Sequence, residues 1–490
     1  MYTSAYPLDR KQVIAAAMLM SALVVAVAVF AVQKFNFTIV AFAGVALIFP
    51  FVFALAPERR LWVLAGMLLA APLNIDQTFM LHPSDGGADG LLLSVTDLLM
   101  LVMLFITLAR ASRIKATGGL RFYPAILLPS LALFLMSIIS TVNARDLLWS
   151  SFDLLSMAKT LIYFWLLANN IRSRRDLDVV LLSLFAAMVM QTLLAALMTF
   201  RPTTVEWMAS IKLGVSKELL ESEEYFGDYY RAGGSIGNAN HLARYLGMIL
   251  PIALVIALTE RRRWMRSAAS VASLVGTLGI IATMTRSAWI GLLVSIAVML
   301  PLMLRHRLLT LRILLRLGAA AMAGAVIVIL FSGPIIERMT NDDNGSAQTR
   351  ITTSKVALAI IKDYPLIGCG INNYGALLPE YWLGEDVFTR KAPVHNNYLI
   401  YAVEIGLLGL GAYLWLLIAA VVRTFRALRS RISYHTAVAV GAAASLAAYC
   451  VEALSDKSYK ESYTLLLTFW ALLAVVEAVN RFNAESPEGF

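Results

Sequence analysis

The sequence predicts an all-α protein, a polytopic bundle of transmembrane helices, and three observations support this fold class. Hydrophobic residues make up 59% of the 490-residue chain, whose mean hydropathy is +0.73. Only 15% of the residues are charged, compared with roughly a quarter in soluble globular proteins. The apolar residues form long continuous runs rather than the short alternating segments of a barrel strand. We therefore expect about 12–14 spans in a single integral membrane domain over residues 1–490.

About fourteen apolar runs are candidates for spans, judged against the roughly 20 residues that a helix needs to cross a bilayer. They lie at about 12–32, 35–56, 60–73, 91–110, 123–141, 155–170, 177–200, 242–259, 267–284, 287–304, 313–331, 396–420, 434–454 and 462–480. The runs at 60–73 and 155–170 are short, which would lower the number of spans. The first run is too long for the apolar core of a signal peptide, so we expect it to be a retained span.

The basic residues of the loops predict the orientation of the chain. Alternate short loops and both termini hold about 24 of the 41 Lys and Arg residues, and the opposite set holds about 17. Because short cytoplasmic loops are enriched in basic residues, we expect an inner-membrane protein with both termini in the cytoplasm. Most of the net charge of +10 is then a topology signal, and we expect membrane lipids rather than nucleic acid as partners.

Two long loops, 201–240 and 332–395, are expected on the periplasmic side and to contain short helices. Loops in helical bundles are usually short, so long ones are candidates for function. The first loop interleaves acidic and aromatic residues, which suits either a sugar or the membrane interface, and both interpretations stay open. The second has a helical pattern over 352–363, which Pro365 and the Gly-Cys-Gly turn at 368–370 would end.

Four side chains on the expected periplasmic face are candidates for chemistry. Arg286 lies between two apolar runs with almost no loop, where a charge is costly unless it has a partner or a function. Arg231 precedes a glycine-rich stretch, and Arg350 begins the helical pattern of the second loop. Guanidinium groups bind phosphate through paired hydrogen bonds, although each could instead extend to lipid headgroups. His395 has a pKa suited to a general base, with a structural hydrogen-bonding role as the alternative.

The sequence does not support a nucleotide or metal site. The glycine-rich stretch at 233–240 lacks the Lys-Ser/Thr ending of a phosphate-binding loop and follows no predicted strand. The histidines expected on the periplasmic face are far apart in sequence. Cys369 and Cys450 form no zinc-like cluster, and we expect free thiols. We therefore expect a site that is independent of metals and has no cofactor.

Several motifs between about residues 230 and 410 together resemble the O-antigen ligase and polymerase superfamily. They are Arg231 followed by Gly234-Ser-Ile-Gly-Asn-Ala-Asn-His-Leu-Ala243, then Thr285-Arg-Ser-Ala288, Arg350, Asp363-Tyr-Pro-Leu-Ile-Gly-Cys-Gly370, His395-Asn-Asn-Tyr-Leu399, Glu404-Ile-Gly406 and Gly409. Each motif is weak alone, whereas their order, spacing and shared face are fairly specific. The Asn-Ala-Asn sequence at 238–240 departs from the commoner Asn-Pro-Asn, which leaves the conformation of this turn open.

The resemblance implies a glycosyltransferase that moves a glycan from a polyprenyl diphosphate to an acceptor hydroxyl at the periplasmic face. The acceptor would be a growing polysaccharide or lipid A–core. Arg231 and Arg286 would bind the diphosphate, with Arg350 assisting, so that fixed positive charge stabilises the leaving group without a metal. His395 would accept or position the hydroxyl proton, and attack opposite the leaving group would invert the anomeric centre. The polar residues that the motifs offer as contacts to sugar or acceptor are Asn238, Asn240, Asn396, Tyr398 and Glu404.

The superfamily leaves several activities open. O-antigen ligase, O-antigen or exopolysaccharide polymerase, and protein O-oligosaccharyltransferase are all compatible with the motifs. The number of expected spans and the loop at 201–240 slightly favour a polymerase. From a different class, a flippase or exporter of lipid-linked oligosaccharide or polysaccharide would also have about 12–14 spans. Such a transporter would often carry internal repeats, and the two halves of this chain show no clear repeat.

Overall fold

The computed structural model is an all-α bundle, as the sequence predicts. It describes residues 58–82, 87–113, 119–200, 225–226, 229–330, 333, 346–382 and 394–485. Nine helices within this part of the chain are long and apolar enough to cross a membrane, so the chain is a multi-pass membrane protein. The runs expected at 12–32 and 35–56 and most of the 201–240 loop lie outside the described residues.

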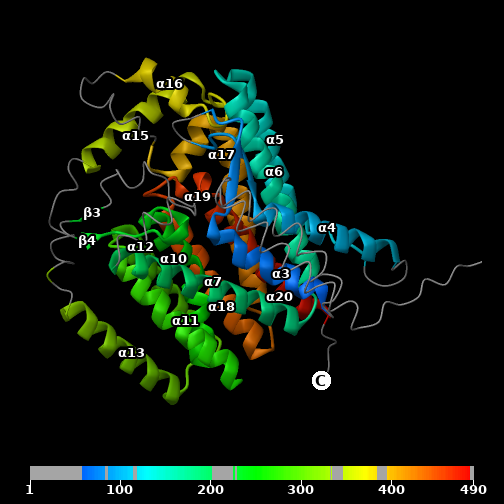
Figure 1. The fold of residues 1–490 in the computed structure, drawn as a ribbon, viewed down its shortest axis with the longest axis vertical. Helices are drawn as coiled ribbons and strands as arrows, with labels where there is room; N and C mark the ends of the chain where they lie inside the picture. The colour runs from blue at the N-terminus through cyan, green and yellow to red at the C-terminus, as the bar shows by residue number, and fades with distance from the viewer. Residues whose placement is uncertain are drawn as a thin grey trace, which may run out of the picture.

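The candidate spans account for most of the described helices (Figure 1). They are α5 (Pro124–Ser140), α6 (Leu147–Asn170), α7 (Arg174–Phe200), α10 (Ala239–Thr259), α11 (Arg263–Ala282), α12 (Arg286–Arg305), α17 (Asn397–Ala427), α18 (Ser433–Glu452) and α20 (Tyr463–Glu485). The short run at 155–170 is therefore part of a longer helix, α6, whereas the short run at 60–73 is a twelve-residue helix and a 3₁₀ turn.

The other elements are helices that connect or flank these spans, 3₁₀ turns and two small antiparallel hairpins. The helices are α3 (Arg59–Ala70), α4 (Val95–Arg113), α13 (Leu311–Leu330), α15 (Ser346–Asp363), α16 (Tyr374–Tyr381) and α19 (Ser458–Glu461). The 3₁₀ turns are η1 (Ala71–Leu73), η2 (Thr141–Asn143) and η3 (Gly234–Ile236). Strands β1 (Asp76–Phe79) and β2 (Leu91–Ser94) pair with Asp76 opposite Ser94, and β3 (Tyr225–Phe226) pairs with β4 (Tyr229–Tyr230). Helices α15 and α16 lie within the residues expected to form the second long loop.

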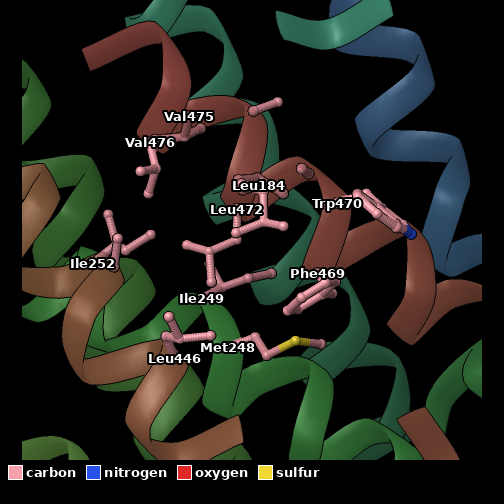
Figure 2. Packing of buried hydrophobic residues seen from close by; sticks show 14 of the residues in the cluster. Leu184, Met248, Ile249, Ile252, Leu446, Phe469, Trp470, Leu472, Val475 and Val476 are labelled. Atoms are coloured by element: carbon pink, nitrogen blue, oxygen red, sulfur yellow. The ribbon is translucent and has the colours of Figure 1, made fainter. Parts of the chain in front are cut away.

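The centre of the bundle is α10, which packs against α7, α11, α18 and α20. Figure 2 shows Ile249 and Ile252 of α10 beside Leu446 of α18 and residues of α20. Gly441 of α18 brings the two backbones close, because a side chain there would collide with the backbone of Ile252. Small residues allow such close approach between helices in lipid, where apolar burial alone does not drive association. Of the candidate spans, α12 is the least buried: 28% of its most apolar 18-residue stretch is buried, compared with 83% for α18 and α20. Helix α12 therefore lies at the margin of the bundle.

One end of the bundle is held together by three charged side chains and a tyrosine from four helix ends. Arg262 pairs with Asp178 at 2.5 Å and with Glu260 at 3.3 Å. The Tyr434 hydroxyl donates to the same aspartate at 2.6 Å. These residues lie in or next to three basic loops, which connect α6 to α7, α10 to α11 and α17 to α18. The loops that the sequence places on one side of the membrane therefore meet at one end of the bundle.

Helix α17 is broken near its start, and the break admits another segment of chain. Gly406 has φ 73° and ψ 179°, which is not helical. The segment after α15 runs beside the break, where the Cys369 N–H donates to the Val403 carbonyl at 2.9 Å and the Leu407 N–H to the Pro365 carbonyl at 2.8 Å. These bonds replace the helical bonds that the break removes, so the motif at 363–370 is held against the first turns of α17.

We predict that Gly406→Ala destabilises the protein. Its backbone lies in a region that is essentially restricted to glycine, where another residue costs about 1–3 kcal/mol, and a Cβ would also collide with the backbone of Leu366. Gly411 is the matched control in the same helix, because a Cβ there meets nothing within 4 Å. Thermal unfolding in detergent should show a lower Tm for Gly406→Ala and an unchanged or higher Tm for Gly411→Ala. Equal effects would contradict the structural role of Gly406.

Candidate functional site

The end of the bundle opposite the Arg262 network brings together side chains that are far apart in sequence. It contains the N-termini of α10, α12 and α17, the C-terminus of α18 and the connection at 453–462. Four arginines lie here, which we call the arginine cluster: Arg231, Arg244, Arg286 and Arg350. Three of them were predicted from the sequence, whereas Arg244 was not.

Arg231 joins the glycine-rich motif to the motif around Arg286. Its Nε donates to the Thr283 carbonyl at 3.0 Å. One Nη donates to Asn240 Oδ1 at 2.9 Å and to Thr285 Oγ1 at 3.3 Å. The Thr285 hydroxyl also donates to Asn240 Oδ1 at 3.1 Å. Arg286 follows as the first residue of α12, so these contacts fix the position from which its side chain leaves the backbone.

The glycine-rich motif forms a tight turn that begins α10. Gly234 and Gly237 have φ 61° and 91°, values that favour glycine over residues with a Cβ. Asn238 is the N-cap of α10, and its side chain accepts hydrogen bonds from the backbone N–H groups of Asn240 and His241. Ala239 is therefore the first helical residue, a position where proline is also favoured. Alanine in place of the commoner proline thus leaves the start of the helix intact.

Arg244 is the most buried member of the arginine cluster, with a side chain that is 2% exposed. One Nη lies 2.9 Å from Asp456 Oδ2 and 3.3 Å from the Ser287 hydroxyl, to which it donates. The other Nη donates to the Asn240 carbonyl at 3.0 Å. Arg244 therefore connects α10, the start of α12 and the segment after α18 through one side chain.

Asp456 is the anion at the centre of the site. Burial raises the pKa of its carboxyl, but Arg244 and a hydrogen bond from Ser458 together hold that pKa well below its usual range. Asp456 therefore stays ionised, and its field acts on both His395 and Arg350. Arg350 also lies within the fields of Arg244 and Arg286, which places α15 at this end of the bundle.

His395 lies directly before α17, beside the arginine cluster. Its Nδ1 is buried and has no hydrogen-bond partner among the described residues. Burial lowers the pKa of His395, Asp456 opposes this shift, and the charges of Arg350, Lys457 and Arg244 add to it. The imidazole is therefore neutral at pH 7 and able to accept a proton.

The residues proposed as contacts to sugar or acceptor use their polar atoms largely within the protein. The Asn396 side chain caps α17 by accepting from the Tyr398 N–H at 2.9 Å, as Asn238 caps α10. The Tyr398 hydroxyl donates to the Cys450 carbonyl at 2.9 Å. Glu404 is fully buried and lies 2.8 Å from the Lys460 ammonium, which also contacts Asp153 at 2.9 Å. Glu404 thus belongs to a buried charged triad with Lys460 and Asp153.

The charge pattern of the sequence does indicate the site residues that the motifs did not include. Arg244 and Glu452 are charged positions at the ends of apolar runs, where a charge in a membrane helix calls for a partner or a function. Asp456, Lys457, Lys460 and Glu461 lie in one short connection between the last two spans. Their roles could not be assigned from spacing, because Arg244 and Asp456 meet only once α10 and α18 have packed together.

Comparison with known protein families agrees with the motifs. Residues 268–414 match the model of the family described as O-antigen ligase. No curated protein matches the chain at a significant level. The matched segment contains Arg286, Arg350 and His395, whereas Arg231, Arg244 and Asp456 lie outside it. The match confirms the resemblance to the O-antigen ligase and polymerase superfamily, and the geometry extends the candidate site beyond the matched segment.

We predict that Arg244→Met strongly destabilises the protein, by about 3–5 kcal/mol, because it leaves the buried Asp456 carboxylate without its partner. The double variant Arg244→Met, Asp456→Asn should recover part of that loss, since no unpaired charge then remains. Thermal unfolding of the two single variants and the double variant in detergent measures this coupling. Strictly additive losses would show that the two residues do not act as a pair.

Proposed function

We propose that this protein of the O-antigen ligase and polymerase type is a glycosyltransferase that uses a polyprenyl-diphosphate-linked glycan as its donor. The arginine cluster beside the buried Nδ1 of His395 carries the proposal. The acceptor would be a hydroxyl of a growing polysaccharide or of lipid A–core. The site would face the periplasm of an inner-membrane protein, because the basic loops gather at the other end of the bundle.

The positive charge of the arginine cluster supports a diphosphate as its ligand. Of the described carboxylates close to it, Asp456 pairs with Arg244 and Glu452 lies 3.9 Å from the same guanidinium. Arg231 donates to neutral oxygens, and Arg286 and Arg350 also carry positive charge at this end. The N-termini of α10 and α12 add partial positive charge. Guanidinium groups bind the oxygens of a diphosphate in pairs, and these charges would favour such an anion.

The proposed reaction uses His395 as the base and the arginines as the groups that stabilise the leaving diphosphate. Neutral His395 would accept the proton of the acceptor hydroxyl as the oxygen attacks the anomeric carbon of the donor sugar. The bond from that carbon to the diphosphate oxygen breaks, and the polyprenyl diphosphate leaves with the electron pair. Fixed arginines stabilise the negative charge that develops on the leaving group. Attack from the face opposite the diphosphate inverts the anomeric centre.

Incubation of the purified protein with a lipid-linked oligosaccharide tests the proposed function, first alone and then with lipid A–core. We expect transfer, with release of polyprenyl diphosphate in equal amount. Chain growth without added core would identify a polymerase, the activity that the sequence slightly favours, and transfer only to core would identify a ligase. Absence of transfer to either acceptor, in protein that still binds the donor lipid, would contradict the proposal and favour a flippase or exporter.

We predict that Arg286→Ala lowers the transfer rate by about 10²–10³, the usual cost of removing one donor that stabilises a developing anion. Arg286→Lys should also be impaired, because lysine is a point charge without the paired donors of a guanidinium. Arg261→Gln is the matched control, since this exposed arginine lies in a loop at the other end of the bundle. A normal transfer rate for Arg286→Lys would show that Arg286 contributes only its positive charge and not the paired donors of its guanidinium.

A pH profile tests the role of His395 separately. Because the pKa of His395 is lowered by burial, its imidazole is neutral at pH 7 and gains a proton only below about 6.5. The transfer rate of the wild type should therefore be constant near neutrality and fall as the pH drops through that lowered pKa. His395→Gln should transfer glycan about 10²–10⁴ times more slowly, and its rate should no longer show this fall at low pH. A His395→Gln variant with the wild-type pH profile would exclude the histidine as the base.

A further inference from the structure

A second positively charged site lies at the end of the bundle opposite the arginine cluster. A pocket of about 510 Å³ opens between the start of α5 and the ends of α17 and α20. Its charged lining residues are four arginines and a glutamate: Arg121, Arg423, Arg426, Arg481 and Glu477. The pocket shares no residue with the site proposed for glycan transfer, so that reaction does not account for it.

Carboxylates neutralise two of these four arginines. Arg423 forms a bidentate pair with Glu477, with both distances at 2.6 Å. Arg121 pairs with Glu485 at 2.6 Å, but both side chains are nearly half exposed, so water screens this pair. Within the described part of the chain, no carboxylate pairs with Arg426 or Arg481. The pocket therefore keeps an excess of positive charge.

Arg481 is the least expected member of the pocket, because it is buried and forms no ion pair with the residues that the structure describes, although Glu477 lies one turn earlier in the same helix. Only 8% of the surface of Arg481 is exposed. One Nη donates to the Tyr123 hydroxyl at 2.6 Å and to the Ala168 carbonyl at 2.9 Å. The other Nη is buried and has no hydrogen-bond partner among the residues that the structure describes. A buried guanidinium with an unused donor is costly, and a bound anion would remove that cost.

The backbone and the surroundings of the pocket indicate what kind of anion fits. Tyr123, Pro124 and Ala125 line it with the N-terminal turn of α5, whose dipole favours negative charge. Exposed apolar side chains occur on the same helix ends: Phe122 lines the pocket and is 51% exposed, and Phe425, between Arg423 and Arg426 in the sequence of α17, is 54% exposed. Three candidate spans end here, so these side chains lie where lipid acyl chains begin.

We propose that this pocket binds the phosphodiester of an anionic phospholipid from the surrounding membrane. Arg426 and the unpaired Nη of Arg481 would donate to the phosphate oxygens, and the acyl chains would lie against Phe122 and Phe425. Basic pockets between helices are typical sites for acidic lipid headgroups. The volume falls within the roughly 300–1,000 Å³ of pockets for small molecules, which is large enough for a headgroup.

The test compares lipids on the purified full-length protein in a neutral detergent. Phosphatidylglycerol, phosphatidylcholine and inorganic phosphate are titrated separately, and binding is followed by native mass spectrometry and by the shift in Tm. We expect saturable binding and stabilisation by phosphatidylglycerol alone. Equal stabilisation by phosphatidylcholine would overturn the proposal, and equal saturation by inorganic phosphate would show a site for a free anion instead of a lipid.

Two variants and a matched control locate the binding. Arg426→Gln changes an exposed side chain and should fold normally, while weakening phosphatidylglycerol binding roughly tenfold through loss of a charged hydrogen bond. Arg481→Gln should weaken it at least as much, but it also removes contacts to Tyr123. Arg429→Gln is the control, since this exposed arginine follows α17 but does not line the pocket. Equal weakening by Arg426→Gln and Arg429→Gln would overturn the assigned site.

Discussion

The buried ion pair of Arg244 and Asp456 is the interaction on which the candidate site depends. Its two members lie 212 positions apart by number and 2.9 Å apart in space. Through it α10, the start of α12 and the connection after α18 are fixed relative to one another. A buried pair of this kind adds little net stability compared with apolar packing. Its value here is to fix the geometry of helix ends that lipid-facing packing alone would leave loosely defined.

The other functional groups take their positions and their charge states from this pair. Asp456 remains ionised because of Arg244, and its field reaches the His395 imidazole and the Arg350 guanidinium. Asn240 accepts from Arg231 through its side chain and from Arg244 through its carbonyl, so two arginines share one residue. The break at Gly406 further fixes this end of the bundle. It holds the 363–370 segment against the first turns of α17, the helix that begins just after His395.

Much of this arrangement could be predicted from sequence, for physical reasons. Hydropathy determines which segments enter a membrane, so all nine candidate spans in the described part of the chain overlap predicted runs. Arg286 was predictable because a charge held between two adjoining apolar runs is costly unless it has a partner or a function. Arg244 and Asp456 were not, because their pairing depends on how α10 and α18 pack. Glu404 likewise resembles a site residue in sequence, whereas in the structure it pairs with Lys460, which lies in a connection 56 positions later.

The central claim is that the arginine cluster binds the donor diphosphate, and a structure with a bound donor tests it most directly. Single-particle cryo-electron microscopy of the protein with a non-reactive polyprenyl-diphosphate glycan in a lipid nanodisc would locate the two phosphates. We expect density for the diphosphate within hydrogen-bond distance of Arg286 and at least one of Arg231 and Arg350, with the anomeric carbon facing His395. A diphosphate bound elsewhere, with these arginines unchanged in position and contact, would contradict it.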